Sequence, residues 1–550
     1  MALLIDLFGY LSVLLHGLTI VAQSMALGGA VFLVFLARPL APHIPDGDGL
    51  ARRIARLAGG AALALVLCEA GKLLMQGAVL EETLGLGAAG VAGASFAVAG
   101  LAKAAGALAL AALLLAAPRA PAAALLGAGG VVLGAATMTT HAAARLEGGA
   151  PLLAASALHI LGAAVWIGGI PSFVMALRRL HDGDALRRVS ARFSRMSMAG
   201  VGCILASAAA FSLAYIGSWD ALYGTAYGVM VSAKLVLFAA LLLLGLGNFL
   251  VVERLRRDPA TPVLRMRRFA EAEIGIGVTL FFAAASLTSV PPSVDLVQDR
   301  VTLSEIAERN APRPLRLASP DRDTLALPAL QSRLDREAEQ ARAVAASAFT
   351  PGGGALPPRN AADIAWSEYN HHWAGLFVGL IGGLALLHRA GVGWARHWPL
   401  VFLGLAAFLF VRADPEAWPL GRIGFFESLR DVEVLQHRTF VVLIAAFAFF
   451  EWGVRTGRLR RPGAALVFPV VTAVGAGLLL THSHAIGNVK EQLLIELSHT
   501  PLALAGVGAG WARWLEVRLH GRGRVARAMG WVWPVCFLVV GAVLMLYREA

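Results

Sequence analysis

The sequence predicts an all-α fold, a polytopic integral membrane helical bundle. Of 550 residues, 58% are hydrophobic and only 15% are charged, and the mean hydropathy is +0.69. A soluble protein of this length needs more polar surface than this composition supplies. The 60 glycines support the same class, because small residues let helices in lipid pack closely.

Apolar runs long enough to cross the bilayer recur along the whole chain. A span needs about 20 predominantly apolar residues to cross roughly 30 Å of hydrocarbon. The first run lacks a basic start and a cleavage site, so we expect a retained span and not a signal peptide. The sequence predicts about 14 transmembrane helices, near 6–36, 55–79, 95–117, 121–140, 152–177, 197–216, 227–251, 270–290, 372–388, 397–412, 436–454, 463–481, 493–515 and 529–547.

A long polar segment divides these spans into two modules. Residues 1–290 form an eight-span module, and residues 372–550 form a six-span module. Between them, 291–371 is charged and rich in proline, with an amphipathic stretch, DTLALPALQSRLDREAEQARAVAASAF, followed by TPGGGALPPRN. We predict a periplasmic linker that contains one or two amphipathic helices and a flexible hinge.

The charges of the short loops predict the orientation. Arginine-rich loops such as RRLHDGDALRRVSARFSR and VRTGRLRRPG alternate with arginine-poor ones such as GSWDALYG. The positive-inside rule places the arginine-rich loops in the cytoplasm and both termini outside. The net charge of +12 is explained by these loops, so no nucleic-acid partner is expected; the partner is the lipid bilayer.

Several function classes are disfavoured by missing motifs. The three cysteines, Cys68, Cys203 and Cys536, stand alone in apolar runs, so neither a disulfide framework nor a thiolate metal site is indicated. No GxxxxGK[ST] motif occurs, which argues against ATP-driven pumping. We assign no catalytic residues and expect that the protein is not an enzyme.

The histidines separate by predicted side of the membrane. Five lie in or beside arginine-rich loops, where a solvated role is sufficient. The other nine fall in the outer ends or outer halves of spans, and polar groups there are costly enough to require a reason. Because imidazole is the commonest metal ligand, we predict a metal site that faces the periplasm, built from His16, His141, His159, His371, His372, His437, His482, His484 and His499.

In the six-span module the spacing suggests how some of these residues are arranged. Glu368 and His372 are four apart, as are Glu433 and His437, so each pair shares a face if the segment is helical. His482 and His484, in THSHAIG, converge only if the chain is extended there. The alternative for each histidine is a structural role, anchoring a helix at the interface or bonding a carbonyl.

In the eight-span module, His16 and His159 are predicted at similar depths below the outer face. His141 lies at the outer mouth, with Met138 three residues before it. A polar stripe through Gln23 and its neighbours Thr19 and Ser24 continues below His16 at helical spacing. Nitrogen and sulfur ligands suit copper better than calcium or magnesium. Glu69 and Lys72 are expected to neutralise each other, the alternative being a proton or ion path, and Lys103 is expected to extend towards the interface.

The ordered motifs of residues 1–290 resemble the copper resistance protein D family. They are a histidine-bearing first span (LSVLLHGLTIVAQSMALGG), ALHILGAAVWIGGIPSFV with His159 and Trp166, an RFS entry to the next span, and T-x-YG…K…N ending at Asn248. The resemblance implies an inner-membrane protein of bacteria that handles copper and receives it from a periplasmic copper-binding chaperone. LQHRTF and the late histidines are similar to the CtaG-type copper-assembly membrane proteins.

Three functions are compatible with these observations. The first is capture of copper at the periplasmic face and transport across the membrane, with Glu368, Glu433, Gln23 and Trp166 supporting the histidines. The second is a membrane electron-transfer protein in which His16 and His159 ligate one b-type haem; such a protein could reduce copper at its outer face. The third is copper delivery at the periplasmic face without transport.

Overall fold

The computed structural model describes most of the chain, and the secondary structure of the described part is almost entirely helical. That part comprises residues 2–85, 87–117, 119–144, 149–297, 300–320, 361–415, 417–481, 489–521 and 523–549, together with positions 336 and 339. Within these ranges the one β-type pairing is an isolated bridge between Ala417 and Ile423. The chain divides into two compact units, the first formed mainly by residues 1–300 and the second mainly by residues 301–349, 355–479 and 487–550.

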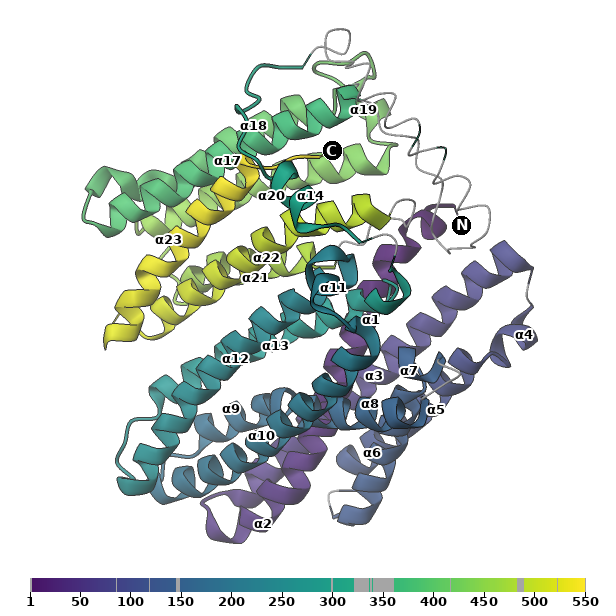
Figure 1. The fold of residues 1–550 in the computed structure, drawn as a ribbon. Coiled ribbons are helices and arrows are strands. Elements are labelled where there is room, and N and C mark those ends of the chain that lie inside the picture. Colours follow the sequence, from purple (N-terminus) through teal and green to yellow (C-terminus); the bar gives the residue numbers. More distant parts are fainter. Residues whose placement is uncertain are drawn as a thin grey trace. The chain divides into compact units, whose positions relative to one another are not determined.

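Unit 1 is a bundle of long helices, three of which continue through a five-residue π-helical segment (Figure 1). π-Helical turns widen a helix locally and occur often at functional sites. The elements are α1 (Ala2–Phe32), η1 (Leu33–Ala37), α2 (Arg38–Leu40), η2 (Ala41–His43), α3 (Gly47–Leu84), α4 (Ala88–Ala92), α5 (Ser95–Leu115), α6 (Ala122–Thr137), α7 (His141–Ala144), α8 (Gly149–Ala163), η3 (Ala164–Gly168), α9 (Ile170–Arg179), α10 (Gly183–Phe211), η4 (Ser212–Ile216), α11 (Trp219–Gly224), α12 (Ala226–Arg257), α13 (Leu264–Leu287) and η5 (Ser293–Asp295).

Helix α1 packs backbone to backbone against η3. A Cβ atom added at Gly168 would lie 1.9 Å from the carbonyl oxygen of Ser24, and one added at Gly28 would lie 2.1 Å from the carbonyl oxygen of Ala164. Without a Cβ at these two positions the helices approach closely, as small residues permit in membrane bundles. Gly168, the first glycine of WIGG, therefore has a packing role, since it fits directly against α1.

The polar stripe of α1 faces protein. Thr19, Gln23 and Ser24 are 1%, 5% and 2% exposed, and α1 contacts α3, α6, α8, α13 and η3. This burial confirms the predicted orientation of the stripe towards other helices. Polar side chains inside a bundle avoid contact with hydrocarbon.

A buried ion pair joins α3 to α5. Lys103 Nζ lies 2.9 Å from Glu69 Oε1, and both residues are 1% exposed. Lys72 lies 3.6 Å from the same carboxylate oxygen, as the sequence predicted. The expectation that Lys103 extends to the interface was wrong, because Glu69 on the neighbouring helix holds its ammonium group inside the bundle.

Unit 2 is a second helical bundle (Figure 1). Its first helix is short and begins with a capping box in which Thr302 and Glu305 bond each other's backbone amides. The elements are α14 (Leu303–Arg309), α17 (Ala361–Arg389), η6 (Gly393–Leu400), α18 (Val401–Arg412), α19 (Phe425–Ser428), α20 (Val432–Arg455), η7 (Ala464–Leu466), α21 (Val467–Leu479), α22 (Val489–Arg518) and α23 (Gly523–Met545).

Glycines and aromatic rings hold unit 2 together. Helices α17 and α23 pack closely, since a Cβ at Gly541 would lie 2.6 Å from the backbone nitrogen of Gly379. The core contains Trp398, Phe468 and Trp533, whose ring centres lie 5.3–5.6 Å apart in edge-on and tilted pairs. Such aromatic geometry adds specificity to apolar burial.

The helices match the predicted spans well. Eleven helices among the described residues are long and apolar enough to cross a membrane, and two shorter apolar helices, Ala122–Thr137 and Ala464–Leu479, coincide with two more predicted spans. Helix α22 covers the remaining one. Helix α17 begins at Ala361, well before the span predicted at 372–388, because its first turns carry polar residues that hydropathy alone does not count. The amphipathic stretch 323–349 lies almost entirely outside the described residues, as does TPGGGALPPRN.

Candidate functional site

His159 on α8 is held by a serine of α10. Its Nδ1 lies 2.9 Å from Ser207 Oγ, which in turn lies 2.9 Å from the carbonyl oxygens of Cys203 and Ile204. When the Ser207 hydroxyl donates its one proton to either carbonyl, as helical serines do, Oγ accepts the bond from His159 Nδ1–H. The lone pair of the imidazole is then on Nε2, the atom that a metal ion would use.

His371 on α17 has the same tautomer for a different reason. Its Nδ1 lies 2.8 Å from the carbonyl oxygen of Ser367, which can only accept, so Nδ1 carries the proton and Nε2 the lone pair. The ring stacks on Tyr547 with centres 3.8 Å apart. His499 of α22 lies edge-on to it, with ring centres 6.2 Å apart. Two imidazoles that bind one metal ion nearly linearly, at about 2.0 Å per metal–N bond, have ring centres roughly this far apart, whereas a tetrahedral angle brings the centres closer.

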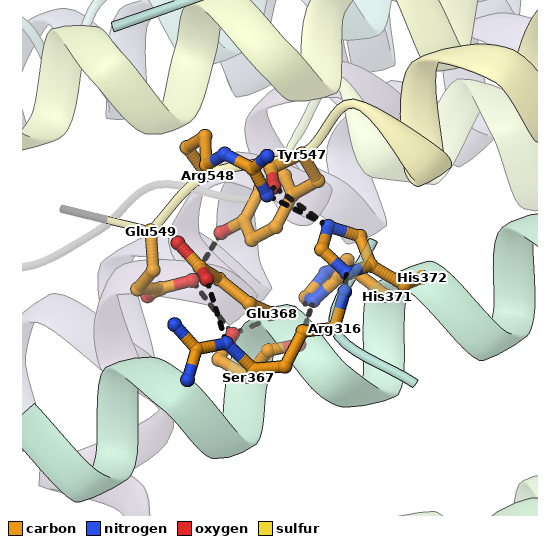
Figure 2. A network of polar contacts seen from close by, with 8 residues as sticks. All are labelled: Arg316, Ser367, Glu368, His371, His372, Tyr547, Arg548 and Glu549. Atoms are coloured by element: carbon orange, nitrogen blue, oxygen red, sulfur yellow. Dashed lines mark hydrogen bonds and ion pairs between the residues drawn. The ribbon is translucent and has the colours of Figure 1, made fainter. Parts of the chain in front are cut away.

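The neighbouring His372 is bound on both ring nitrogens, as Figure 2 shows. Nδ1 accepts a bond from the backbone N–H of Arg316 at 2.9 Å, and Nε2 lies 3.2 Å from the Tyr547 carbonyl and 3.0 Å from Arg548 Nη1. Arg316 Nε also lies 3.1 Å from Glu368 Oε2. The predicted shared face of Glu368 and His372 is confirmed, and both side chains anchor the segment around Arg316 to α17. They fit the structural alternative better than metal ligation.

His437 on α20 is paired with an acid. Its Nδ1 lies 2.6 Å from Asp414 Oδ1, and carboxylate–histidine pairs of this kind orient metal-ligating imidazoles in many proteins. Glu433 lies one turn earlier on α20, and its side chain is outside the described part.

The other predicted residues are distributed over unit 1 or lie outside the described part. His16 is half-buried on α1, and Trp166 is 3% exposed in η3, edge-on to Phe238. Met138 is 55% exposed in the turn after α6. His141 begins α7, but its side chain is not described. His482 and His484 fall in 482–488, outside the described residues.

The structure brings some of these residues together and separates others. His371, His372 and His499 lie around Tyr547 in unit 2, and α1 and α8, which carry His16 and His159, are in contact in unit 1. Among the described residues, no group of three or more His, Cys, Asp or Glu side chains is arranged to hold a metal ion.

The comparison with known families identifies part of unit 1. Residues 187–287, which run from α10 to the end of α13, match the family model described as copper resistance protein D. This segment belongs to the copper resistance protein D family. The copper resistance protein D segment includes Ser207, the partner of His159, whereas His16, His141 and His159 precede it in the chain.

One curated relative supports the same family. The chain is 34% identical over 137 residues to the copper transport protein CutJ of Bacillus subtilis (strain 168). The match covers 24% of this chain and 24% of CutJ, so the chain spans about a quarter of the length of that relative. No solved structure matches the chain. The protein is thus a copper-related, multi-pass membrane protein.

Sequence reasoning missed the partners that orient the histidines. Ser207 stands in the small-residue run CILASAAAF, where nothing distinguishes it from packing residues. Tyr547 lies 176 positions after His371, and Arg316 lies 56 positions before His372. Only the fold brings each pair together. Asp414, in VRADPEAW, could have been predicted as a partner of an outer histidine, because an acid beside the outer end of a span needs a polar or charged partner.

Proposed function

We propose that the protein captures copper at the periplasmic face and carries it across the membrane. The observation that carries this proposal is that Nδ1 of His159 and Nδ1 of His371 each lie within hydrogen-bond distance of a protein oxygen. With the proton on Nδ1, the lone pair of each ring is on Nε2. Metal-ligating histidines have this arrangement. In unit 2, His371 and His499 capture the ion. In unit 1, His159 passes it towards the buried polar stripe of α1.

The setting that we propose follows from the sequence and the family. The chain has fourteen spans in the inner membrane of a bacterium, with both termini outside, because the arginine-rich loops orient it. A separate periplasmic copper-binding chaperone supplies the ion. The protein is a carrier and not an enzyme.

The first test is copper uptake by the full chain reconstituted in liposomes, with a fluorescent copper chelator enclosed. We expect His159→Ala to abolish uptake. Ser207→Ala should weaken it by roughly 10–100-fold, as loss of a residue that orients a ligand does in other metal sites. Ser212→Ala, an exposed serine on the same helical run, is the control and should transport like the wild type. Normal uptake by His159→Ala would remove unit 1 from the path.

The second test is copper binding by the detergent-solubilised chain. His371→Ala and His499→Ala should each lower the copper affinity or stoichiometry measured by equilibrium dialysis, because each removes one imidazole of the pair. His520→Ala, an exposed loop histidine, should not change either quantity. If all three variants bind copper like the wild type, the pair beside Tyr547 is not a capture site.

The same samples distinguish the two other functions. Copper bound at the outer site without uptake by the wild type would indicate delivery to another protein. A Soret band that disappears in His159→Ala or in His16→Ala would indicate that these histidines hold haem b. We expect copper and no Soret band, since both comparisons concern copper.

A further inference from the structure

Unit 1 contains a cavity that the histidine sites do not use. It has a volume of about 330 Å³ and is lined by residues of η3, α9, α10, α12 and α13. Among its lining residues Glu273 is the one ionisable side chain. Glu273 is 3% exposed, so this carboxyl group is buried in the membrane-spanning part of the bundle.

The bonds around Glu273 leave its charge unbalanced. Asn248 Nδ2 donates a 2.6 Å bond to Glu273 Oε1, and no Lys or Arg in the described part of the chain forms an ion pair with this carboxyl group. Of the nearby cations, Arg178 of α9 and Arg268 of α13 both bind Glu271. Arg265 of α13 lies over the Phe269 ring, 4.9 Å from its centre, beside Gly247 of α12, and is not among the residues that line the cavity. An intramembrane carboxylate without a cationic partner is costly and marks an ion or proton pathway in many transporters.

The other charged groups on the surrounding helices are not at the cavity. On α10, Arg192 and Arg195 are absent from its lining. On α12, Lys234 is 14 residues from Asn248, about 21 Å along the helix at 1.5 Å per residue. Segment η3 has no charged residue, and α1 contributes no Lys, Arg, Asp or Glu between residues 7 and 32.

Three more polar atoms at this cavity have no hydrogen-bond partner among the described residues. They are Asn248 Oδ1 and the hydroxyl oxygens of Ser190 and Ser197. Ser190 is 0% exposed. Buried polar atoms without partners are rare and require an explanation, of which an unseen ion is one. All three, like the carboxylate, are oxygen atoms, which suit hard cations better than copper(I).

We propose that Glu273 and Asn248 form a binding site for one hard monovalent cation, H⁺ or Na⁺. The cation neutralises the Glu273 carboxylate. Asn248 Nδ2 fixes the orientation of this carboxylate by its hydrogen bond, and Asn248 Oδ1 is a second oxygen ligand for the cation. The pair lies nine residues before the end of α12 at Arg257 and nine residues after the start of α13 at Leu264, roughly 13 Å from the arginine-rich ends of both helices. If the protein carries copper as proposed above, this site couples that movement to a cation gradient.

The binding step is tested without copper, by infrared difference spectroscopy of the full-length detergent-solubilised chain at a series of pH values, in choline chloride and in sodium chloride. We expect a protonated-carboxyl band that is lost in Glu273→Gln and retained in Glu253→Gln, the same change at the exposed end of α12. A band that decreases with rising pH in both salts identifies H⁺. A band that sodium chloride removes at constant pH identifies Na⁺.

Two results would overturn the proposal: no carboxyl band that depends on Glu273 at any pH, or a Glu273-dependent band that changes neither with pH nor with sodium chloride. Glu273→Asp separates binding from packing, since it keeps the carboxyl group and should retain a shifted band.

The coupling step, which rests on the proposed function, is tested in liposomes. There, Glu273→Gln should lose the stimulation of copper uptake by a pH or Na⁺ gradient while its copper binding stays unchanged. A persistent carboxyl band in a wild type that transports no copper would refute the transport function and leave the cation site intact.

Discussion

Gly168→Ala is expected to cause a large loss of folded protein. The added Cβ atom would lie 1.9 Å from the carbonyl oxygen and 2.5 Å from the carbonyl carbon of Ser24, so α1 and η3 must separate. Overpacking of this kind typically costs about 1–3 kcal/mol and sometimes more, and here the obstacle is backbone that cannot rotate away. The measurement is the apparent melting temperature and the yield of monodisperse protein in detergent, by size-exclusion chromatography after heating.

Gly202→Ala is the matched control for this change. Gly202 lies on α10, and nothing within 4 Å would meet a Cβ there. Since alanine is favoured over glycine in a helix by about 1 kcal/mol, this variant should be as stable as the wild type or slightly more so. Equal melting temperatures for the two variants would contradict the close contact between α1 and η3.

Glu69→Gln is the second change with a large expected effect. It leaves the ammonium groups of Lys72 and Lys103 facing an uncharged amide inside the bundle, where Lys103 is 1% exposed. Removal of one partner from a buried ion pair destabilises proteins by about 3–5 kcal/mol. We expect a large fall in the apparent melting temperature of the detergent-solubilised chain.

Two further variants test the reason for that effect. Glu82→Gln changes an exposed acid near the end of the same helix and should alter the melting temperature little. Lys103→Met, introduced together with Glu69→Gln, should recover part of the lost stability, because it removes the uncompensated charge. A single Glu69→Gln variant as stable as Glu82→Gln would show that the ion pair between α3 and α5 contributes little.

Residues close in sequence were placed correctly by sequence reasoning. The predicted spans correspond to helices because each apolar run is long enough to cross a bilayer. The stripe of Thr19, Gln23 and Ser24 is buried as predicted, since helical spacing places these residues on one side of α1. Glu368 and His372 share a face of α17 and both bind Arg316, for the same reason.

Contacts between distant helices were not predictable in this way. Many spans are apolar around their whole circumference, on the lipid side as well as the protein side, so the sequence gives no signal for how each helix is rotated. That rotation decides that Lys103 reaches Glu69, that Ser207 fixes His159 and that Tyr547 stacks on His371. It also decides that Glu273 and Asn248 meet at a cavity.

By itself, then, the sequence determined the class of the protein, the approximate limits of its long helices, the likeness to a copper-handling family and the set of candidate histidines. These properties depend on composition, run length and local spacing. Only the tertiary structure decided which nitrogen of His159 and of His371 is left for a metal ion, and that His372 holds a chain segment in place. The physical reason is that a tautomer is set by hydrogen-bond partners, and several of those partners are distant in the chain.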